Sequence, residues 1–305
     1  MNQSEETFSW QWQGKSMTIG VTRCGAGPTL LILPALSTIS TRHEMLALQR
    51  LLGARYATVA VDWPGFGELP RPRLRWTPDV LGAFVIALLA HYAPRYAVAA
   101  GHGAGYLLEA LSREDAVASS SVEAAALLAP TWRGPLPTMA NCPQTRRDRP
   151  LYRRLRRAVD APLLGPLLYR LNVCGPMVRK MSTEHVYEDP HWLDDPQRMA
   201  SKRAVLEAEN ARFASVRFVT GALDPFISRE AFLDVASAAG IPLLALVPEL
   251  APKRSKAEML ALGTLDRVTL ELLPHGRLAS HEEFPAQAAR CIEEWGQFSY
   301  DRPGD

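Results

Sequence analysis

Apolar and polar residues alternate in blocks along this chain, and the blocks predict strands and helices in regular succession. Residues 8–25, FSWQWQGKSMTIGVTRCG, alternate with an interruption at Gln13-Gly14, which predicts a β-hairpin. The continuous apolar run TLLILPAL is typical of a strand buried on both faces. Further strands are predicted at 57–63, 96–101 and 122–130, separated by helical patterns at 43–53, from Thr77, and to about Arg113. This succession predicts an α/β fold with a mostly parallel sheet covered by helices on both faces.

The regular succession stops after residue 130 and resumes near residue 213. Residues 131–212 contain proline clusters and several short helical patterns, without a convincing strand. We therefore expect a core formed by 1–130 and 213–305, divided by a helical insertion at 131–212. The predicted elements after the insertion are strands at 216–225, 241–247 and 268–274, and helices at 229–239, 255–262 and 284–297.

The composition is that of a soluble globular protein. The chain has 305 residues, of which 47% are hydrophobic and 22% charged, and a net charge of +2 provides no general argument for nucleic acid binding. The first residues lack the pattern of a signal peptide, and the longest apolar run, Val80 to Ala90, is too short for a membrane span. The four cysteines are far apart with no C-x-x-C pair, so we expect neither zinc nor disulfides, no cofactor, and a cytoplasmic location.

Candidate chemistry centres on residues 97–110, AVAAGHGAGYLLEA, which combine a strand, a glycine-rich turn and a helix. The spacing of Gly101, Gly103 and Gly105 is that of Gly-x-Ser-x-Gly, the nucleophile elbow that lifts a serine out of a sheet. The central residue here is Gly103, which has no side chain to act as a nucleophile.

The order of motifs resembles the α/β-hydrolase superfamily over essentially the whole chain. The resemblance is carried by the N-terminal hairpin and by LPALS (33–37), DWPGFG (62–67), GHGAG (101–105) and HEEFP (281–285). More narrowly, APTWRGPLPTM (129–139) and APKRSKAEM (251–259) are similar to a divergent branch, associated with cyanobacteria and plastids, that lacks the elbow serine. The resemblance implies the α/β-hydrolase fold, with the insertion as a cap over the active site.

The resemblance also assigns the three positions of a Ser-His-Asp triad, and none carries the usual residue without ambiguity. The nucleophile corresponds to Gly103, and the histidine to Leu278, seven residues before Pro285. His275 and His281 lie three residues either side of Leu278; they are weak catalytic candidates that a rearranged loop could recruit, but we interpret them as surface-loop histidines.

The acid position has two alternatives. It is Asp224 if the acid follows 216–225, or Ala251-Pro252, with Glu249 nearby, if it follows 241–247. The distance along the chain to the histidine position favours the second. Hydrolysis by the usual residues is not expected in either case.

Other groups of the predicted site remain candidates for binding or catalysis. The backbone N–H of Ala104, with that of Leu36 or Ser37, would form an oxyanion-type donor pair. His102 is a weak catalytic candidate that this fold usually packs below the elbow, and Ser37 is the best substitute nucleophile, although a loop serine more often caps backbone groups. Trp132 and Arg133 at the start of the cap either contact an anionic, partly apolar ligand or act as a hinge and a strand cap.

Residues 146–157, RRDRPLYRRLRR, predict a short basic amphipathic helix on the cap with Leu151, Tyr152 and Leu155 interleaved. Such a helix fits an anionic membrane surface or an acidic protein partner. No nucleic acid partner is expected, because no nucleic-acid fold or aromatic platform accompanies it. The seven arginines of this patch are Arg146, Arg147, Arg149, Arg153, Arg154, Arg156 and Arg157.

Three functions follow from these observations. The first, which we favour, is a non-hydrolytic protein that binds a small ligand or a partner. The second is an enzyme with non-standard residues, such as a lyase, isomerase or cofactor-free oxygenase using His102 or Asp224. The third is a hydrolase with a relocated nucleophile such as Ser37. The fold cannot decide among them, because function depends on the site.

Overall fold

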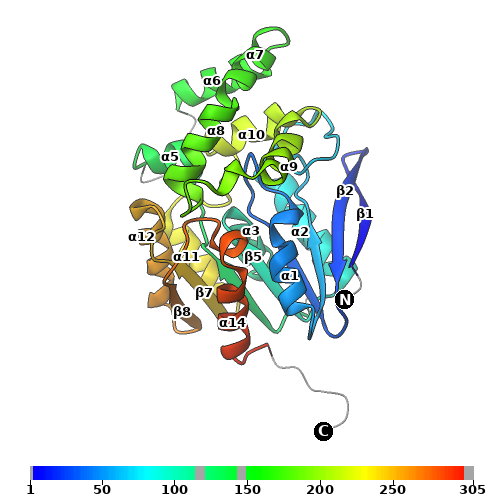
Figure 1. The fold of residues 1–305 in the computed structure, drawn as a ribbon, viewed down its shortest axis with the longest axis vertical. Helices are drawn as coiled ribbons and strands as arrows, with labels where there is room; N and C mark the ends of the chain where they lie inside the picture. The colour runs from blue at the N-terminus through cyan, green and yellow to red at the C-terminus, as the bar shows by residue number, and fades with distance from the viewer. Residues whose placement is uncertain (1–2, 114–120, 143–148, 299–305) are drawn as a thin grey trace.

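An eight-stranded sheet in the order β1-β2-β4-β3-β5-β6-β7-β8 forms the centre of the molecule (Figure 1). This computed structural model describes residues 3–113, 121–142 and 149–298. β1 and β2 pair antiparallel, as do β2 and β4, and all other pairs are parallel. The predicted α/β fold is confirmed. The strands are β1 (Gln3–Trp12), β2 (Lys15–Cys24), β3 (Thr29–Leu33), β4 (Ala57–Val61), β5 (Tyr96–Ala100), β6 (Ala124–Leu128), β7 (Leu243–Pro248) and β8 (Val268–Leu273).

The predicted hairpin is formed by β1 and β2, which are joined by a two-residue turn. Gln13 and Gly14 have φ angles of 48° and 76°, the left-handed conformation that a type I′ turn requires at both central residues. Trp12 pairs with Lys15 directly across this turn. The turn therefore sets the register of the whole hairpin.

Helices cover both faces of the sheet, and successive side chains of β3 point alternately into the two cores between the sheet and these helices. Leu31 and Leu33 point into a core shared with α2, α3 and α11, whereas Leu30 and Ile32 point into a core shared with α1 and α14. All four leucine and isoleucine side chains are fully buried, which explains the unbroken apolar run. The helices of the core are η1 (Arg42–Met45), α1 (Leu46–Leu52), α2 (Pro78–Tyr92), α3 (His102–Leu111), α11 (Arg229–Ala238), α12 (Lys253–Ala261), η4 (Leu262–Thr264), α13 (Ser280–Glu283) and α14 (Pro285–Glu294).

The insertion between β6 and α11 contains helices and no strand in the part that the structure describes. Its helices gather beyond one end of the sheet, and α6 and α7 lie farthest from it (Figure 1). Its elements are α5 (Pro135–Met139), α6 (Pro150–Asp160), α7 (Leu164–Asn172), α8 (Gly175–Met181), η2 (Ser182–Val186), η3 (Trp192–Asp194), α9 (Pro196–Glu207) and α10 (Ala211–Val219).

The strand predicted at 216–225 is wrong, because helix α10 occupies its first part. Ala211, Ala214 and Phe218 are buried at helical spacing, and Ala214 and Phe218 pack into the main core. Packing of this apolar face outweighs the strand preference of valine and phenylalanine. The predicted boundary between residues 212 and 213 consequently falls inside a helix.

Over the described ranges, no helix combines the length and the apolar character that crossing a membrane would require.

Candidate functional site

The turn between β5 and α3 places Gly101 at the carboxyl end of the central strand. β5 ends at Ala100 and α3 begins at His102, so Gly101 makes the turn alone, with φ 51° and ψ −126°. Only glycine adopts this conformation without strain. A Cβ atom at Gly101 would lie 3.2 Å from the Cβ of Ala35 and 3.8 Å from the Oγ1 of Thr131. In a nucleophile elbow this sharp strand-to-helix turn is the position of the nucleophile.

The prediction that Gly103 occupies the turn is therefore wrong by two residues. Gly103 lies in the first turn of α3, where an added Cβ would approach the backbone oxygen of Pro34 to 2.9 Å. The sequence is ambiguous because small residues at 99, 101, 103 and 105 fit the motif in two registers. Both registers leave the nucleophile position without a side chain.

Because Gly101 and not Gly103 forms the turn, the backbone N–H group that could serve as an oxyanion donor is also a different one. The N–H of Ala104 donates to the carbonyl oxygen of Gly101 at 3.2 Å, so its predicted oxyanion role is wrong. The corresponding group is the N–H of His102, which as the first residue of α3 has no acceptor within the helix. Ala35 and Leu36, in the loop after β3, lie on the other side of the turn.

Ser37 is engaged within that same loop. Its Oγ lies 2.7 Å from the Oγ of Ser40 and accepts a hydrogen bond from the N–H of Ile39 at 3.3 Å. These contacts are those of a serine that stabilises a turn.

His102 joins a hydroxyl and a carboxylate directly below the turn. Its Nδ1 lies 2.9 Å from Thr131 Oγ1, and its Nε2 lies 3.2 Å from Asp224 Oδ1. Asp224 Oδ1 also accepts a hydrogen bond from the N–H of Gly134 at 2.8 Å. His102 is 3% exposed and Asp224 fully buried. Sequence reasoning named both but missed Thr131, whose only signal is its place just after β6.

Aliphatic residues that pack together stand at the position that the resemblance predicts for the triad histidine and at the second of the two predicted acid positions. Leu278 and Ala251 belong to one apolar cluster with residues of β7, α12 and the end of β6. The second acid alternative requires a strand that ends just before Ala251. β7, which ends at Pro248, is that strand. Glu249 is exposed and pairs with Lys256 at 3.0 Å, away from this cluster. The other members of the cluster are Ala129, Val247, Met259 and Leu270.

The two histidines near Leu278 have different environments. His275 is exposed, stacks on Phe284 and lies 3.7 Å from Glu188, as a surface histidine would. His281 is 1% exposed in α13, so the surface-loop interpretation is wrong for it. Neither of its ring nitrogens makes a hydrogen bond within the described part of the chain. Burial lowers the pKa of His281 to about 4, because the charged imidazolium is disfavoured there.

A buried ion cluster next to His281 joins the insertion to the core. Lys202 of α9 places its Nζ 2.6 Å from Glu44 Oε1 and 3.1 Å from Glu282 Oε2, and the Tyr187 hydroxyl donates to Glu282 at 2.7 Å. Burial raises the pKa of Glu44 to about 7. Burial acts in the same direction on Glu282, but the Lys202 ammonium and the Tyr187 hydroxyl outweigh it and lower its pKa. The Lys202 ammonium thus forms ion pairs with both carboxylates at the junction between insertion and core.

Trp132 and Arg133 are held by Glu258 of α12. Trp132 Nε1 lies 3.2 Å from Glu258 Oε2, and Arg133 Nη2 lies 2.8 Å from Oε1. Arg229 donates to the same carboxylate at 2.7 Å. Trp132 is 1% and Arg133 9% exposed, which leaves no side-chain surface for the predicted ligand contact. Arg133 does not cap a strand end as the structural alternative expected: it bonds Glu258 and the carbonyl oxygen of Cys142, and a buried guanidinium requires such a carboxylate. The stretches 129–139 and 251–259 therefore contact each other.

A pocket of about 490 Å³ lies between the loop after β3 and the insertion. Thr38 of that loop forms part of its wall, together with Leu136 of α5, Leu168 of α7 and Val216 of α10. The volume is within the range of small-molecule sites, and most of the lining is aliphatic.

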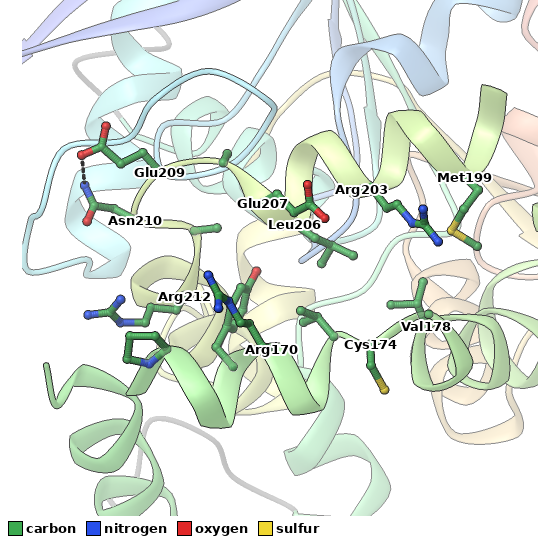
Figure 2. A pocket seen from close by; sticks show the side chains of 16 residues that line it. Arg170, Cys174, Val178, Met199, Arg203, Leu206, Glu207, Glu209, Asn210 and Arg212 are labelled. Atoms are coloured by element: carbon green, nitrogen blue, oxygen red, sulfur yellow. Dashed lines mark hydrogen bonds between the residues drawn. The ribbon is translucent and has the colours of Figure 1, made fainter. Parts of the chain in front are cut away.

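A second pocket, of about 690 Å³, lies inside the insertion between α7–α8 and α9–α10. Figure 2 shows Arg170 and Arg212 on one side of it and Arg203 beside Met199 on the other. None of its lining residues comes from the loop after β3 or from the turn at Gly101. The smaller pocket is therefore the candidate site.

The predicted basic helix is α6. Arg146 and Arg147 lie outside the described residues; Arg149, Arg153, Arg154 and Arg157 are exposed, and Arg156 donates to Thr220 Oγ1 at 3.3 Å. Within the described ranges, no cluster of three or more histidine, cysteine, aspartate or glutamate side chains has the arrangement of a metal site.

Comparison with known proteins agrees with this architecture. Residues 30–305 match the model of the alpha/beta hydrolase family, and the chain belongs to that family. Haloalkane dehalogenase DatA from Agrobacterium tumefaciens C58 superposes with a TM-score of 0.67 at 17% identity, over 95% of this chain and 96% of that one. A thermophilic esterase from Thermogutta terrifontis, malate bound, gives 0.67 at 15% identity over 98% and 100%.

A probable hydrolytic enzyme from Pseudomonas aeruginosa PAO1 gives a TM-score of 0.67 at 16% identity, over 97% of this chain and 94% of that one. Identities this low establish the shared fold alone. Among curated protein sequences there is no significant match.

Proposed function

We propose that this member of the alpha/beta hydrolase family binds a small, mainly apolar ligand under its helical insertion and does not hydrolyse it with a Ser-His-Asp triad. One observation carries the proposal: Leu278 and Ala251 pack in a single apolar cluster, while Gly101 forms the turn. Triad hydrolysis requires a nucleophile, a base that accepts its proton and an acid that orients the base. Aliphatic side chains transfer no protons, so restoring one position alone would not restore the chemistry.

The lining of the smaller pocket indicates the class of ligand. Leu136, Leu168 and Val216 offer aliphatic contacts, and they would accommodate a hydrocarbon chain or ring. Thr38 Oγ1 is buried and makes no hydrogen bond within the described residues, so it would bond a polar atom of the ligand. A medium-chain carboxylic acid, alcohol or ester combines these two features. Structural neighbours that include a dehalogenase and an esterase support a small organic molecule in this fold.

A fluorescent fatty acid, 11-(dansylamino)undecanoate, tests the binding. We expect saturable binding that Leu136→Trp weakens by at least tenfold, because indole would fill the pocket. Arg203→Trp is the matched control: it adds the same side chain to the larger pocket and should leave the affinity unchanged. Equal loss in both variants, or turnover of p-nitrophenyl butyrate by the unmodified protein, would refute the proposal.

A second candidate function, acyl transfer from Thr131, is favoured by the contacts of His102. If Nε2 carries the proton and donates to Asp224, Nδ1 is left to accept the proton of the Thr131 hydroxyl. An activated nucleophile consists of a hydroxyl, a histidine that accepts its proton and a carboxylate that orients the histidine, and these three groups are present here. Thr131 Oγ1 also lies beside the turn at Gly101. A purely structural histidine that stabilises the turn would show the same burial and the same two hydrogen bonds. Ligand binding is therefore our first proposal.

A fluorophosphonate probe separates the two candidates. Binding without triad chemistry predicts no covalent adduct at any residue. An adduct mapped to Thr131 by peptide mass spectrometry, abolished by Thr131→Val and by His102→Asn, would establish the second candidate instead. Thr131→Val keeps the shape of the side chain but removes the hydroxyl that bonds His102, so thermal unfolding must show that the variant is folded.

A further inference from the structure

Helices α6 and α7 expose large apolar side chains at the end of the molecule farthest from the sheet (Figure 1). The two helices pack against each other, and Leu163, at the connection between them, is 91% exposed. Single exposed leucines are ordinary, but five on two short neighbouring helices form a patch of the kind that marks an interaction site. We call this patch the hairpin face and define its apolar part as Leu151, Leu163, Leu164, Leu167 and Leu171.

Arginines accompany the leucines at helical spacing. Arg149, Arg153 and Arg157 recur every fourth residue along the exposed side of α6. Leu151 and Leu155 recur at the same interval and are both exposed, but the offset of two residues places them on the opposite side of α6 from these arginines. From residue 149 to residue 172 the only acidic residue is Asp160, and it is paired with Arg217 at 2.8 Å. The hairpin face is therefore apolar at the connection between its helices and strongly cationic along one side of α6.

We propose that the hairpin face docks on an anionic membrane surface. Leucines at the tip would enter the boundary between headgroups and acyl chains, while the long arginine side chains reach the lipid phosphates. The exposed leucines favour a membrane over an acidic protein as the partner. An acidic protein surface would pair with the arginines but leave Leu163 and Leu164 in water. Anionic lipid attracts basic side chains that lie near the surface, and the contributions of several arginines add together.

Docking in this way would also place the smaller pocket near the lipid. Val159 of α6 and Leu168 of α7 line that pocket, so the two helices of the hairpin face also form part of its wall. This consequence rests on the proposed function, whereas the docking itself does not. A protein that binds vesicles but not the fluorescent fatty acid would retain the docking proposal and lose the ligand.

Vesicle flotation of the full chain tests the docking. We compare vesicles of phosphatidylcholine alone with vesicles that contain about a third phosphatidylglycerol, at low and high salt. The protein should float with the anionic vesicles and remain behind with the neutral ones. Arg153→Gln/Arg154→Gln and Leu163→Gln/Leu167→Gln should each reduce the bound fraction at least tenfold, and high salt should reduce it for the unmodified protein.

Matched controls lie on parts of the surface away from the hairpin. Lys253→Gln/Arg290→Gln removes two positive charges from exposed positions on α12 and α14, and Leu260→Gln/Leu272→Gln removes two exposed leucines from α12 and β8. Both should bind like the unmodified protein. All eight side chains are exposed, so thermal unfolding should confirm that every variant folds.

Three results would overturn the proposal. One is the absence of binding to anionic vesicles, and another is equal loss in the hairpin and control variants. The third is a stable dimer in light scattering that Leu163→Gln/Leu167→Gln dissociates, which would assign the hairpin face to a second copy of this chain.

Discussion

The strained turn at Gly101 leads to a prediction in which two glycine substitutions have opposite effects. Gly101 has φ 51° and ψ −126°, a region that residues with a side chain enter only at a cost of about 1–3 kcal/mol. An alanine Cβ would also approach the Cβ of Ala35 to 3.2 Å, so the loop after β3 must yield slightly. We therefore expect Gly101→Ala to lower the free energy of unfolding by about 1–3 kcal/mol.

The matched control is Gly82→Ala in the middle of α2. Its Cβ would meet only a carboxylate oxygen of Glu109, at an ordinary distance of 3.7 Å. Replacing glycine by alanine inside a helix removes an entropic cost, so this variant should gain about 0.5–1 kcal/mol. Urea denaturation measures both values, and equal slopes would confirm that the two unfolding transitions expose the same surface.

The corresponding serine variant tests the chemistry of the same position. Gly101→Ser should show the strain of Gly101→Ala and no hydrolysis of p-nitrophenyl butyrate, because Leu278 and Ala251 supply neither base nor acid. A stable Gly101→Ala variant would contradict the strained turn. Measurable turnover by Gly101→Ser would show that a base, such as His102, serves this position after all.

Three further predictions concern buried charges. Lys202→Met leaves two buried carboxylates without their cation and should cost about 3–5 kcal/mol in urea unfolding, and the added change Glu44→Gln should recover part of the loss. The pKa of His281 is about 4 in the folded chain and about 6.5 in the unfolded chain. The free energy of unfolding should therefore decrease as pH falls from 6.5 towards 4, and His281→Leu should remove about 3 kcal/mol of that pH dependence. Glu258→Ala leaves Arg133 buried without its carboxylate and should cost about 3–5 kcal/mol by thermal or urea unfolding.

Each of these has an outcome that would count against it. Unchanged stability of Lys202→Met would mean that water already reaches the cluster. Parallel pH profiles for His281→Leu and the unmodified protein would place His281 in solvent. A Glu258→Ala variant as stable as Lys253→Ala, a control at an exposed position of the same helix, would contradict the proposed role of Glu258 in holding Trp132 and Arg133.

The alternation of apolar and polar residues was enough to predict most of the core. The turn at Gln13-Gly14, the apolar run of β3 and the succession of strands and helices each depend on nearby residues, and local pattern carries that information. The order of motifs was also enough to identify the superfamily, which the family model confirms. Local pattern failed at α10, where burial against the core decides between helix and strand.

The site depended on distances that no local pattern contains. A glycine-rich run fits the elbow in two registers, and only the end of β5 shows that Gly101 makes the turn. Glu258 lies more than a hundred residues from Trp132 and Arg133, so the contact that buries them is invisible along the chain.

Thr131, His102 and Asp224 likewise meet only because the start of α3 and two loops converge beyond the carboxyl ends of β5 and β6. The sequence by itself determined most of the elements of the core and the superfamily to which the chain belongs. Only the tertiary structure decided which polar groups are buried and paired, because a hydrogen bond or an ion pair depends on distance in space.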